Sequence, residues 1–248
     1  MKTRLTLKRL LTIAPVFLLM TTFQSCTHYY YGPNANNIPL LKKSGDVRAS
    51  LALATAAETG GVELQSALAI SNHVGAMLNF YRATGSNGES KGSGTYIEGG
   101  AGYFKTLSEE RIVLEAYGGA GVGSISNSDS YGSSKVAAQK MFVQPSIGFS
   151  FFDSRLEFAF ACRFSHVSLK VTESTMPQTS DGLNDPIGDL KSNPNHFFIE
   201  PGFMIRSGFQ KVKWQIQYTA SKESRHQNYL TQPGIISIGM LFAFSKNE

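Results

Sequence analysis

Residues 212–219 read Val-Lys-Trp-Gln-Ile-Gln-Tyr-Thr, an alternation of apolar and polar side chains. Because successive side chains of a β-strand point to opposite faces, this period of two predicts a strand with one apolar and one polar face. Comparable segments lie at or near residues 46–54, 62–70, 73–83, 94–106, 110–124, 137–152, 154–171, 195–208 and 233–246. The sequence therefore predicts an all-β protein of about ten strands.

The connections between these segments alternate strictly between short and long, beginning and ending with a long one. Short links are predicted at residues 72, 107–109, 153–154 and 207–208. Long links are predicted at residues 56–60, 85–93, 126–135, 173–194 and 222–233. A soluble β-sandwich has no reason to sort its connections by length, whereas outer-membrane barrels combine short periplasmic turns with longer extracellular loops.

With this pattern, residues 46–248 resemble the small outer-membrane β-barrel proteins of Gram-negative bacteria. The last strand ends in Leu241-Phe242-Ala243-Phe244, similar to the aromatic-ended last strand of that class, although four polar residues follow it. The resemblance implies a closed antiparallel transmembrane β-barrel of about ten strands, with eight as the alternative. It also implies an outer-membrane location and outer-membrane lipids as partners. Other envelope proteins are an alternative class of partner.

The two rows of each strand predict the two sides of the barrel wall. The apolar rows, such as Phe158, Phe160 and Phe164, are expected to face lipid. The opposite rows carry charges of both signs: Arg48, Glu63, Glu98, Glu115, Lys140, Arg155, Glu157, Arg163, Glu200, Arg206 and Lys213. In a barrel of this size we expect these charges to pair with one another and to fill the lumen. A selective polar pathway through the lumen is the alternative.

Residues 1–25 have the pattern of a signal peptide, because a basic start is followed by a short apolar run over residues 10–20. The Ser25-Cys26 pair that follows resembles the lipobox of bacterial lipoproteins, although Phe23 and Gln24 depart from its commonest form. The resemblance implies that Cys26 is diacylated and becomes the mature N-terminus, which leaves Cys162 without a disulfide partner. An ordinary signal peptide that is cleaved nearby is the alternative.

Residues 27–45 are too polar and too rich in turn-forming residues to predict regular structure. We therefore expect residues 26–45 to be a lipid-anchored tether, and the absence of an acidic run after Cys26 favours the periplasmic side. Its tyrosines, Tyr29–Tyr31, are expected at the barrel rim or the membrane interface. Four of the 23 Lys and Arg residues lie in the leader, so the remaining chain is nearly neutral and no nucleic-acid partner is expected.

The spacing of His166 and Ser168 is similar to that in outer-membrane lipid A deacylases, which use a Ser/His pair and a carboxylate. Leu169-Lys170 replaces the Asn-Ala continuation of that family. Glu200 lies on the inner row, so no acid is expected beside the imidazole of His166. A Ser-His-acid triad is therefore not expected. His166 and Ser168 are therefore candidates only, and no catalytic residue is assigned.

No cofactor or metal is expected. Asp181, Asp185 and Asp189 do not have the spacing of an EF-hand, the histidines are scattered, and the glycine-rich stretch 118–123 is not followed by a helix or a lysine. We expect a non-enzymatic protein with a structural or binding role, whose loops at residues 126–135, 173–194 and 222–233 form its variable surface. A narrow pore, a subunit of an envelope complex and a lipid-modifying hydrolase are the alternatives.

Overall fold

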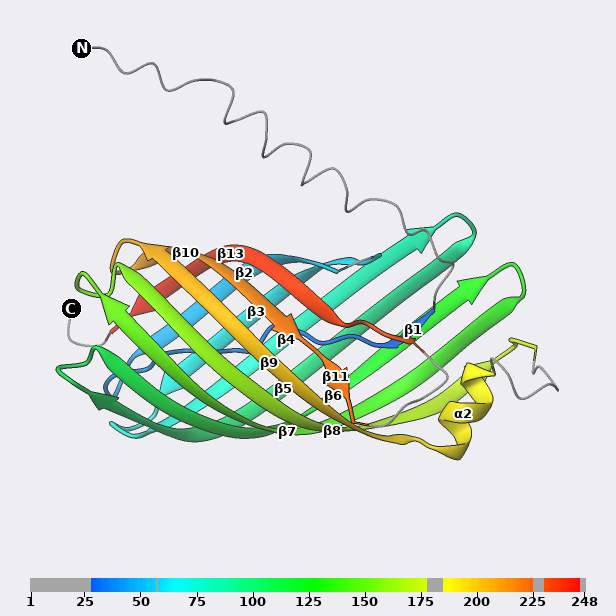
Figure 1. The fold of residues 1–248 in the computed structure, drawn as a ribbon, viewed down its shortest axis with the longest axis horizontal. Helices are drawn as coiled ribbons and strands as arrows, with labels where there is room; N and C mark the ends of the chain where they lie inside the picture. Colours follow the sequence, from blue (N-terminus) through cyan, green and yellow to red (C-terminus); the bar gives the residue numbers. More distant parts are fainter. Residues whose placement is uncertain (1–27, 57, 178–184, 225–229, 246–248) are drawn as a thin grey trace, which may run out of the picture.

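Ten antiparallel strands close into a single barrel (Figure 1). The structure is a computed structural model that describes residues 28–56, 58–177, 185–224 and 230–245. The strands are β2 (Val47–Thr55), β3 (Gly60–Ala69), β4 (Val74–Asn87), β5 (Ser90–Leu107), β6 (Ile112–Asp129), β7 (Gly132–Phe151), β8 (Leu156–Ser174), β9 (Asn195–Gly208), β10 (Val212–Ala220) and β13 (Gly234–Phe244).

Each strand pairs with its neighbours in the chain, and the last strand pairs with the first. Strand β13 runs antiparallel to β2, with a register that extends from Ile236 opposite Thr55 to Phe244 opposite Val47. This pairing closes the sheet, so the predicted ten-stranded closed antiparallel barrel is confirmed and the eight-stranded alternative is wrong.

Smaller elements lie at one end of the barrel. Strands β1 (Tyr29–Tyr31) and β12 (Leu230–Thr231) form a parallel pair, and β11 (Lys222–Glu223) adds to β9. The short helix α2 (Pro186–Ser192) begins at Asp185, whose side chain accepts a hydrogen bond from the Gly188 amide at 2.9 Å. Its Ile187 and Leu190 are buried in an apolar cluster with residues of β6, β7 and β8. Within the described ranges, no helix is long and apolar enough to cross a membrane.

The two ends of the barrel differ, and we name them by their connections. The turn end carries the β3–β4, β5–β6, β7–β8 and β9–β10 connections, and both Val47 and Phe244 lie there. Residues with positive φ make two of these turns, at 108–110 and 152–154. The loop end carries the β2–β3, β4–β5, β6–β7, β8–β9 and β10–β13 connections.

Two of the long links predicted for the loop end are wrong. Residues 85–93 and 126–135 do not form loops, because strands β4 to β7 continue through them and leave only two residues at each turn. Their Ser, Gly and Asn residues suggested loops because both faces of these strand extensions are polar. Hydrogen bonds between paired strands, and not a buried apolar row, hold this part of the sheet together.

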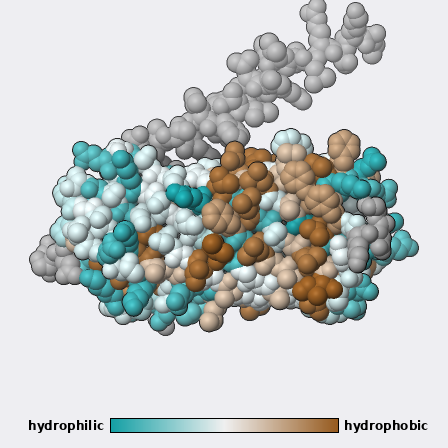
Figure 2. Space-filling model, turned by 180° about the vertical axis from the view of Figure 1, so that it is seen from behind, coloured by the Kyte–Doolittle hydropathy of each residue, from teal (hydrophilic) through white to brown (hydrophobic). Residues whose placement is uncertain are grey.

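The strands on one side of the barrel are longer than a membrane requires. A transmembrane strand needs about 9–11 residues, which β2, β3, β10 and β13 match with 9, 10, 9 and 11. Strands β5 to β8 have 18, 18, 20 and 19 residues. Figure 1 shows the β4–β5 and β6–β7 hairpins projecting at the loop end. Figure 2 shows apolar side chains in a band that is flanked by more hydrophilic surface at both ends.

The outer face of the barrel is apolar. Large apolar side chains alternate with buried ones along the strands and remain exposed, among them Leu51, Leu53, Met141, Phe160, Trp214 and Ile238. Water does not favour such a surface around a closed barrel, whereas an outer-membrane barrel has an apolar band that faces lipid. The surface thus agrees with the predicted outer-membrane location.

Candidate functional site in the barrel lumen

The lumen is filled by the N-terminal part of the chain itself. Residues 29–41, which we call the plug, run along the inside of the barrel (Figure 1, blue), and Tyr30, Tyr31, Ile38, Leu40 and Leu41 are each 0–1% exposed. The expectation that residues 26–45 form a periplasmic tether is therefore wrong for residues 29–41, which lie in the lumen. Cys26, the predicted lipidation site, lies outside the described residues.

The backbone of the plug binds polar side chains of the barrel wall. The Ala35 amide donates to Glu63 Oε1 at 2.6 Å, and the Leu41 amide donates to Glu115 Oε1 at 3.1 Å. Three wall glutamines donate to plug carbonyls: Gln65 to Ala35 at 3.0 Å, Gln144 to Asn37 at 2.6 Å and Gln217 to Asn36 at 2.9 Å. An irregular backbone can be buried when its polar groups find such partners.

The asparagine side chains of the plug make further bonds to the wall. Asn34 donates to Glu98 Oε2 at 2.9 Å, and Asn36 donates to the Glu200 carbonyl at 3.0 Å. Asn37 donates to Asn79 Oδ1 at 2.7 Å and to the Ser66 carbonyl at 3.1 Å. These contacts reach β3, β4, β5 and β9, so the plug is fixed to widely separated parts of the wall.

Glycines on the inner face of the wall make room for the plug. A Cβ atom at Gly148 would collide with the side chain of Leu40, and one at Gly75 would lie 2.7 Å from Leu41 Cδ1. Leu40 has a φ of 54°, a left-handed conformation that is costly for leucine and that persists only where its surroundings enforce it. The wall and the plug are therefore shaped to each other.

A charged cluster surrounds the loop-side half of the plug. Lys140 Nζ lies 3.0 Å from Glu98 Oε1 and 3.5 Å from Glu200 Oε2, and Arg163 NH1 lies 3.3 Å from Glu98 Oε2. Both cations also donate to Asn34 Oδ1, from Lys140 at 3.3 Å and from Arg163 at 3.1 Å. Because all four charged side chains are at most 1% exposed, each relies on its protein partners in place of water.

A second charged cluster lies nearer the turn end. Glu157 Oε1 is 2.5 Å from Lys213 Nζ, and its Oε2 is 3.8 Å from Arg206 NH1. Arg206 also donates to Gln215 Oε1 at 2.5 Å and to the Pro39 carbonyl at 3.5 Å. Arg48 lies 3.8 Å from Asp46.

The residues predicted for the inner row are thus placed in three ways. Glu98, Lys140, Arg163 and Glu200 meet in one cluster, and Glu157, Arg206 and Lys213 meet in another, while Glu63 and Glu115 bind plug amides. Arg155 is exposed in the β7–β8 turn, so its placement on the inner row is wrong. The left-handed residues 152–154 turn the chain before β8 begins at Leu156.

His166 and Ser168 lie on β8 with their side chains on the outer side of the wall, where His166 is exposed. The residues in register with His166 on the neighbouring strands are Met141 and Phe197. Glu200 is fully buried in the lumen and accepts hydrogen bonds from Tyr31 and Ser165, at 2.6 and 2.8 Å. This placement brings no acid to the imidazole on either adjoining strand.

The described residues contain no group of three or more His, Cys, Asp or Glu that would suit a metal ion. His73 stacks on Tyr103 with ring centroids 5.4 Å apart, and His196 Nδ1 lies 2.8 Å from Glu223. Asp185 is occupied as the cap of α2, and Asp181 lies outside the described residues.

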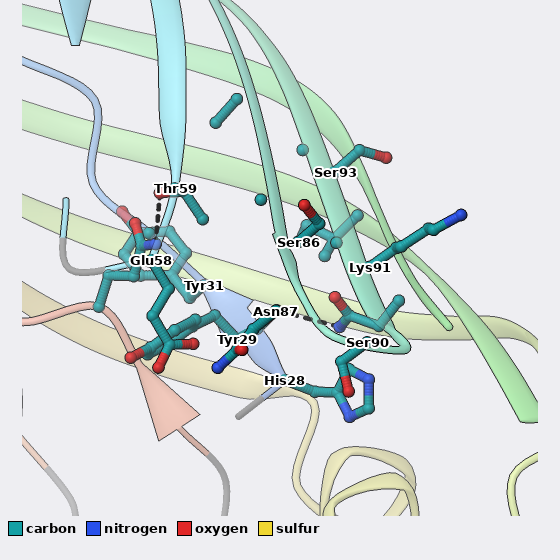
Figure 3. Close-up of a pocket in the computed structure, with 18 of the residues that line it drawn as sticks. His28, Tyr29, Tyr31, Glu58, Thr59, Ser86, Asn87, Ser90, Lys91 and Ser93 are labelled. Atoms are coloured by element: carbon teal, nitrogen blue, oxygen red, sulfur yellow. Dashed lines mark hydrogen bonds between the residues drawn. The ribbon is translucent and has the colours of Figure 1, made fainter. Parts of the chain in front are cut away.

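Among the residues that the structure describes, a hollow lies at each end of the plug. At the turn end, an open polar vestibule with a volume of about 670 Å³ is lined by charges of both signs, including Lys42, Arg48, Glu109, Arg111 and Lys213. Lys42 Nζ donates to Ser154 Oγ there at 2.8 Å, and burial lowers the pKa of this lysine. At the loop end, a smaller hollow with a cavity volume of about 80 Å³ lies between β1 and the β4–β5 hairpin (Figure 3).

Sequence reasoning missed the plug because it treats an aperiodic polar segment as a linker. Two features of residues 29–41 are nevertheless informative. The segment has neutral amides at Asn34, Asn36 and Asn37 and no charge, and it ends in the apolar Ile38-Pro39-Leu40-Leu41. An apolar end of this kind is unusual for a solvated linker, and neutral amides can satisfy buried carboxylates without adding charge.

Comparisons with known proteins leave the chain without a family assignment. No family model matches it, and no curated protein matches it. Among solved structures, it is similar to the NanC porin in a rhombohedral crystal form, with 9% identity and a TM-score of 0.33. The similarity covers 79% of this chain and 98% of the porin. At this TM-score no residue role transfers between the two, so the architecture is taken from the strand pairing of the chain itself.

We predict that Glu98→Ala destabilises the folded barrel by about 3–5 kcal/mol, because it leaves Lys140 and Arg163 buried without their shared carboxylate. Glu173→Ala is the control, since it removes the carboxylate of an exposed pair with Lys135 and is expected to cost at most about 1 kcal/mol. Urea unfolding in lipid vesicles measures both. Equal losses for the two variants would contradict the role of Glu98 in holding the cluster.

Proposed function

We propose that this chain is a non-enzymatic outer-membrane lipoprotein with a binding or structural role. In this proposal its own N-terminal plug closes the barrel, which presents its loop end to the outside of the cell. The observation that carries the proposal is the plug. A barrel whose lumen is occupied by a segment of its own chain has no open path for solutes. The binding surface is then the loop end and not the lumen.

The direction of the plug bears on where the N-terminus lies. We follow the chain backwards from the start of β2, which lies at the turn end. There the Ser44 amide donates to Asn72 Oδ1 in the β3–β4 turn at 3.0 Å. It reaches the loop end at His28, whose Nε2 is 3.7 Å from Asp129 near the β6–β7 turn. Loops of outer-membrane barrels face outward and turns face the periplasm. Cys26, two residues before His28, would then carry its lipid at the outer surface. This proposal takes the place of the periplasmic tether that the sequence alone favours.

The alternatives are less well supported. A pore would need the plug to leave a lumen in which it makes many hydrogen bonds. A hydrolase at His166 and Ser168 would need an acid that neither neighbouring strand places beside the imidazole. A subunit of an envelope complex remains compatible with the exposed wall of β5 to β8.

The first test is conductance in planar lipid bilayers. We predict that the full chain gives no steady current, whereas a variant without residues 29–41 conducts, because the deletion empties the lumen. Heat-modifiable gel migration verifies that the deletion variant folds. Steady conductance of equal size from both proteins would contradict the proposal.

A second wall variant guards against misfolding of the deletion variant. Gly148→Leu places a side chain where Leu40 lies and is expected to displace the plug and produce intermittent current. Gly99→Leu is the matched control: Gly99 is on the outer face, and a Cβ there has its nearest neighbour, the Met77 carbonyl, at 3.9 Å. The control is expected to stay closed.

The second test locates the N-terminus. We predict that an epitope tag inserted after Thr27 binds antibody on intact cells, whereas a tag after Glu248 binds only after the outer membrane is permeabilised. A Cys26→Ala variant is expected to lose the mass of the attached lipid. Detection of the N-terminal tag only after permeabilisation would refute the surface location.

A further inference from the structure

The vestibule at the turn end has an inner and an outer part that differ in burial. The side chains of Arg48 and Lys213 are 13% and 2% exposed, whereas those of Arg111 and Glu109 are 73% and 88% exposed. We call the inner part, with Lys42, Arg48 and Lys213, the floor, and the exposed part the rim. The volume of about 670 Å³ is in the range of small-molecule sites in proteins.

The floor carries more cations than carboxylates. Four cations interact electrostatically there: Lys42, Arg48, Arg206 and Lys213. Within the described ranges, their ion pairs are made with two carboxylates, those of Asp46 and Glu157. Cations that are shielded from water depend on nearby negative charge. The floor therefore has an excess of positive charge that an anion can balance.

Lys42 is the cation of the floor that lacks a carboxylate partner. Among the described residues, its ammonium donates to the neutral hydroxyl of Ser154 at 2.8 Å, and no carboxylate pairs with it. Burial lowers the pKa of Lys42, although the more distant Glu157 and Glu110 attract its charge. The ammonium thus loses solvation that its surroundings replace only in part. A bound anion would offset this cost.

Arg48 is held only weakly by its acid. Its NH2 lies 3.8 Å from Asp46 Oδ2, which is beyond hydrogen-bond distance. The same oxygen already accepts the backbone amides of Lys42 and Lys43, at 3.0 and 3.3 Å. A guanidinium can donate two parallel hydrogen bonds to a phosphate or a carboxylate group. Arg48 is therefore suited to bind such a group from the vestibule.

The rim carries carboxylates as well, but water surrounds them. Glu109 lies 3.8 Å from Arg111, and both side chains are largely exposed. Glu110 and Asp153 are exposed too. Charges in contact with water are largely screened beyond about 8–10 Å at physiological salt. The preference of the vestibule for one sign of charge therefore depends on its floor.

We propose that the vestibule binds a small oxyanion, a molecule with phosphate or carboxylate groups, between Lys42 and Arg48. This site goes beyond the function proposed above, because it lies at the opposite end of the plug from the loop-end surface. Exposed rings of Phe151, Phe152 and Phe244 also line the vestibule, so it admits an anionic lipid headgroup as well as a free anion.

The test is isothermal titration calorimetry of the full chain, folded in maltoside micelles in a Tris chloride buffer of low ionic strength. The probes are pyrophosphate, citrate and dihexanoyl phosphatidylglycerol. The first two are free anions, and the third carries the same chemistry on a lipid headgroup. We expect saturable binding. Binding of pyrophosphate or citrate identifies a free anion as the ligand, whereas binding of the phosphatidylglycerol alone identifies a headgroup.

The variant Ser154→Asp supplies the carboxylate that Lys42 lacks. Residue 154 has a φ of 63°, a left-handed conformation that Asp adopts more readily than most residues. The variant is expected to lower the affinity for the anion at least about tenfold, because its own carboxylate competes for the ammonium. The stability of the barrel is expected to be equal or higher, so this loss of binding is not a loss of folding.

The matched control is Ser108→Asp. It adds the same charge at a φ of 50° in the β5–β6 turn, where residue 108 is exposed and does not line the vestibule. A second pair removes a cation: Lys42→Met is expected to weaken binding, whereas Lys105→Met, at an exposed position outside the vestibule, leaves it unchanged. Heat-modifiable gel migration verifies the folding of all four variants.

Three results would overturn the anion site: no saturable binding of any probe, an affinity that neither Ser154→Asp nor Lys42→Met changes, or equal losses in the two control variants. Equal losses would mean that the probes respond to the overall charge of the turn end. These results are distinct from failure of the proposed function, because the conductance and epitope tests do not involve the vestibule.

Discussion

The fold of this protein depends on the need of buried polar groups for partners. A barrel wall in lipid pairs its backbone by closing the sheet, as β13 does with β2. Its inner face still carries carboxylates and cations that the lumen must satisfy. The plug supplies many of the missing partners, as when Ala35 and Leu41 donate their amides to Glu63 and Glu115. Wall and plug therefore stabilise each other, because buried polar groups of each find hydrogen-bond partners on the other.

The same constraint explains the distribution of charge in the lumen. Glu98 is shared by Lys140 and Arg163, and Asn34 of the plug accepts from both cations while it donates to the carboxylate. A neutral amide in this position links charges of both signs without adding one. A charged residue there would leave a net charge in a space that excludes water.

The barrel was predictable from the sequence, whereas its contents were not. Alternation in segments such as 212–219 determines which side chains face outward, because a strand has a period of two. The residues of the inner row follow from the same period, with the exception of Arg155, which lies in a turn. The path of residues 29–41 follows no period, since it depends on contacts with strands that are far away in sequence. The hairpin ends at residues 85–93 and 126–135 were mistaken for loops because outside the membrane neither face of a strand has to be apolar.

The epitope and conductance experiments concern what the plug does, but its position in the lumen is the central claim. Hydrogen–deuterium exchange of the full chain in micelles tests it most directly, through the backbone amides of Ala35, Asn36 and Leu41, which donate to wall side chains. The account predicts that peptides from residues 30–41 exchange as slowly as those from β6 and β7. Complete exchange within seconds, as in an unstructured linker, would contradict it.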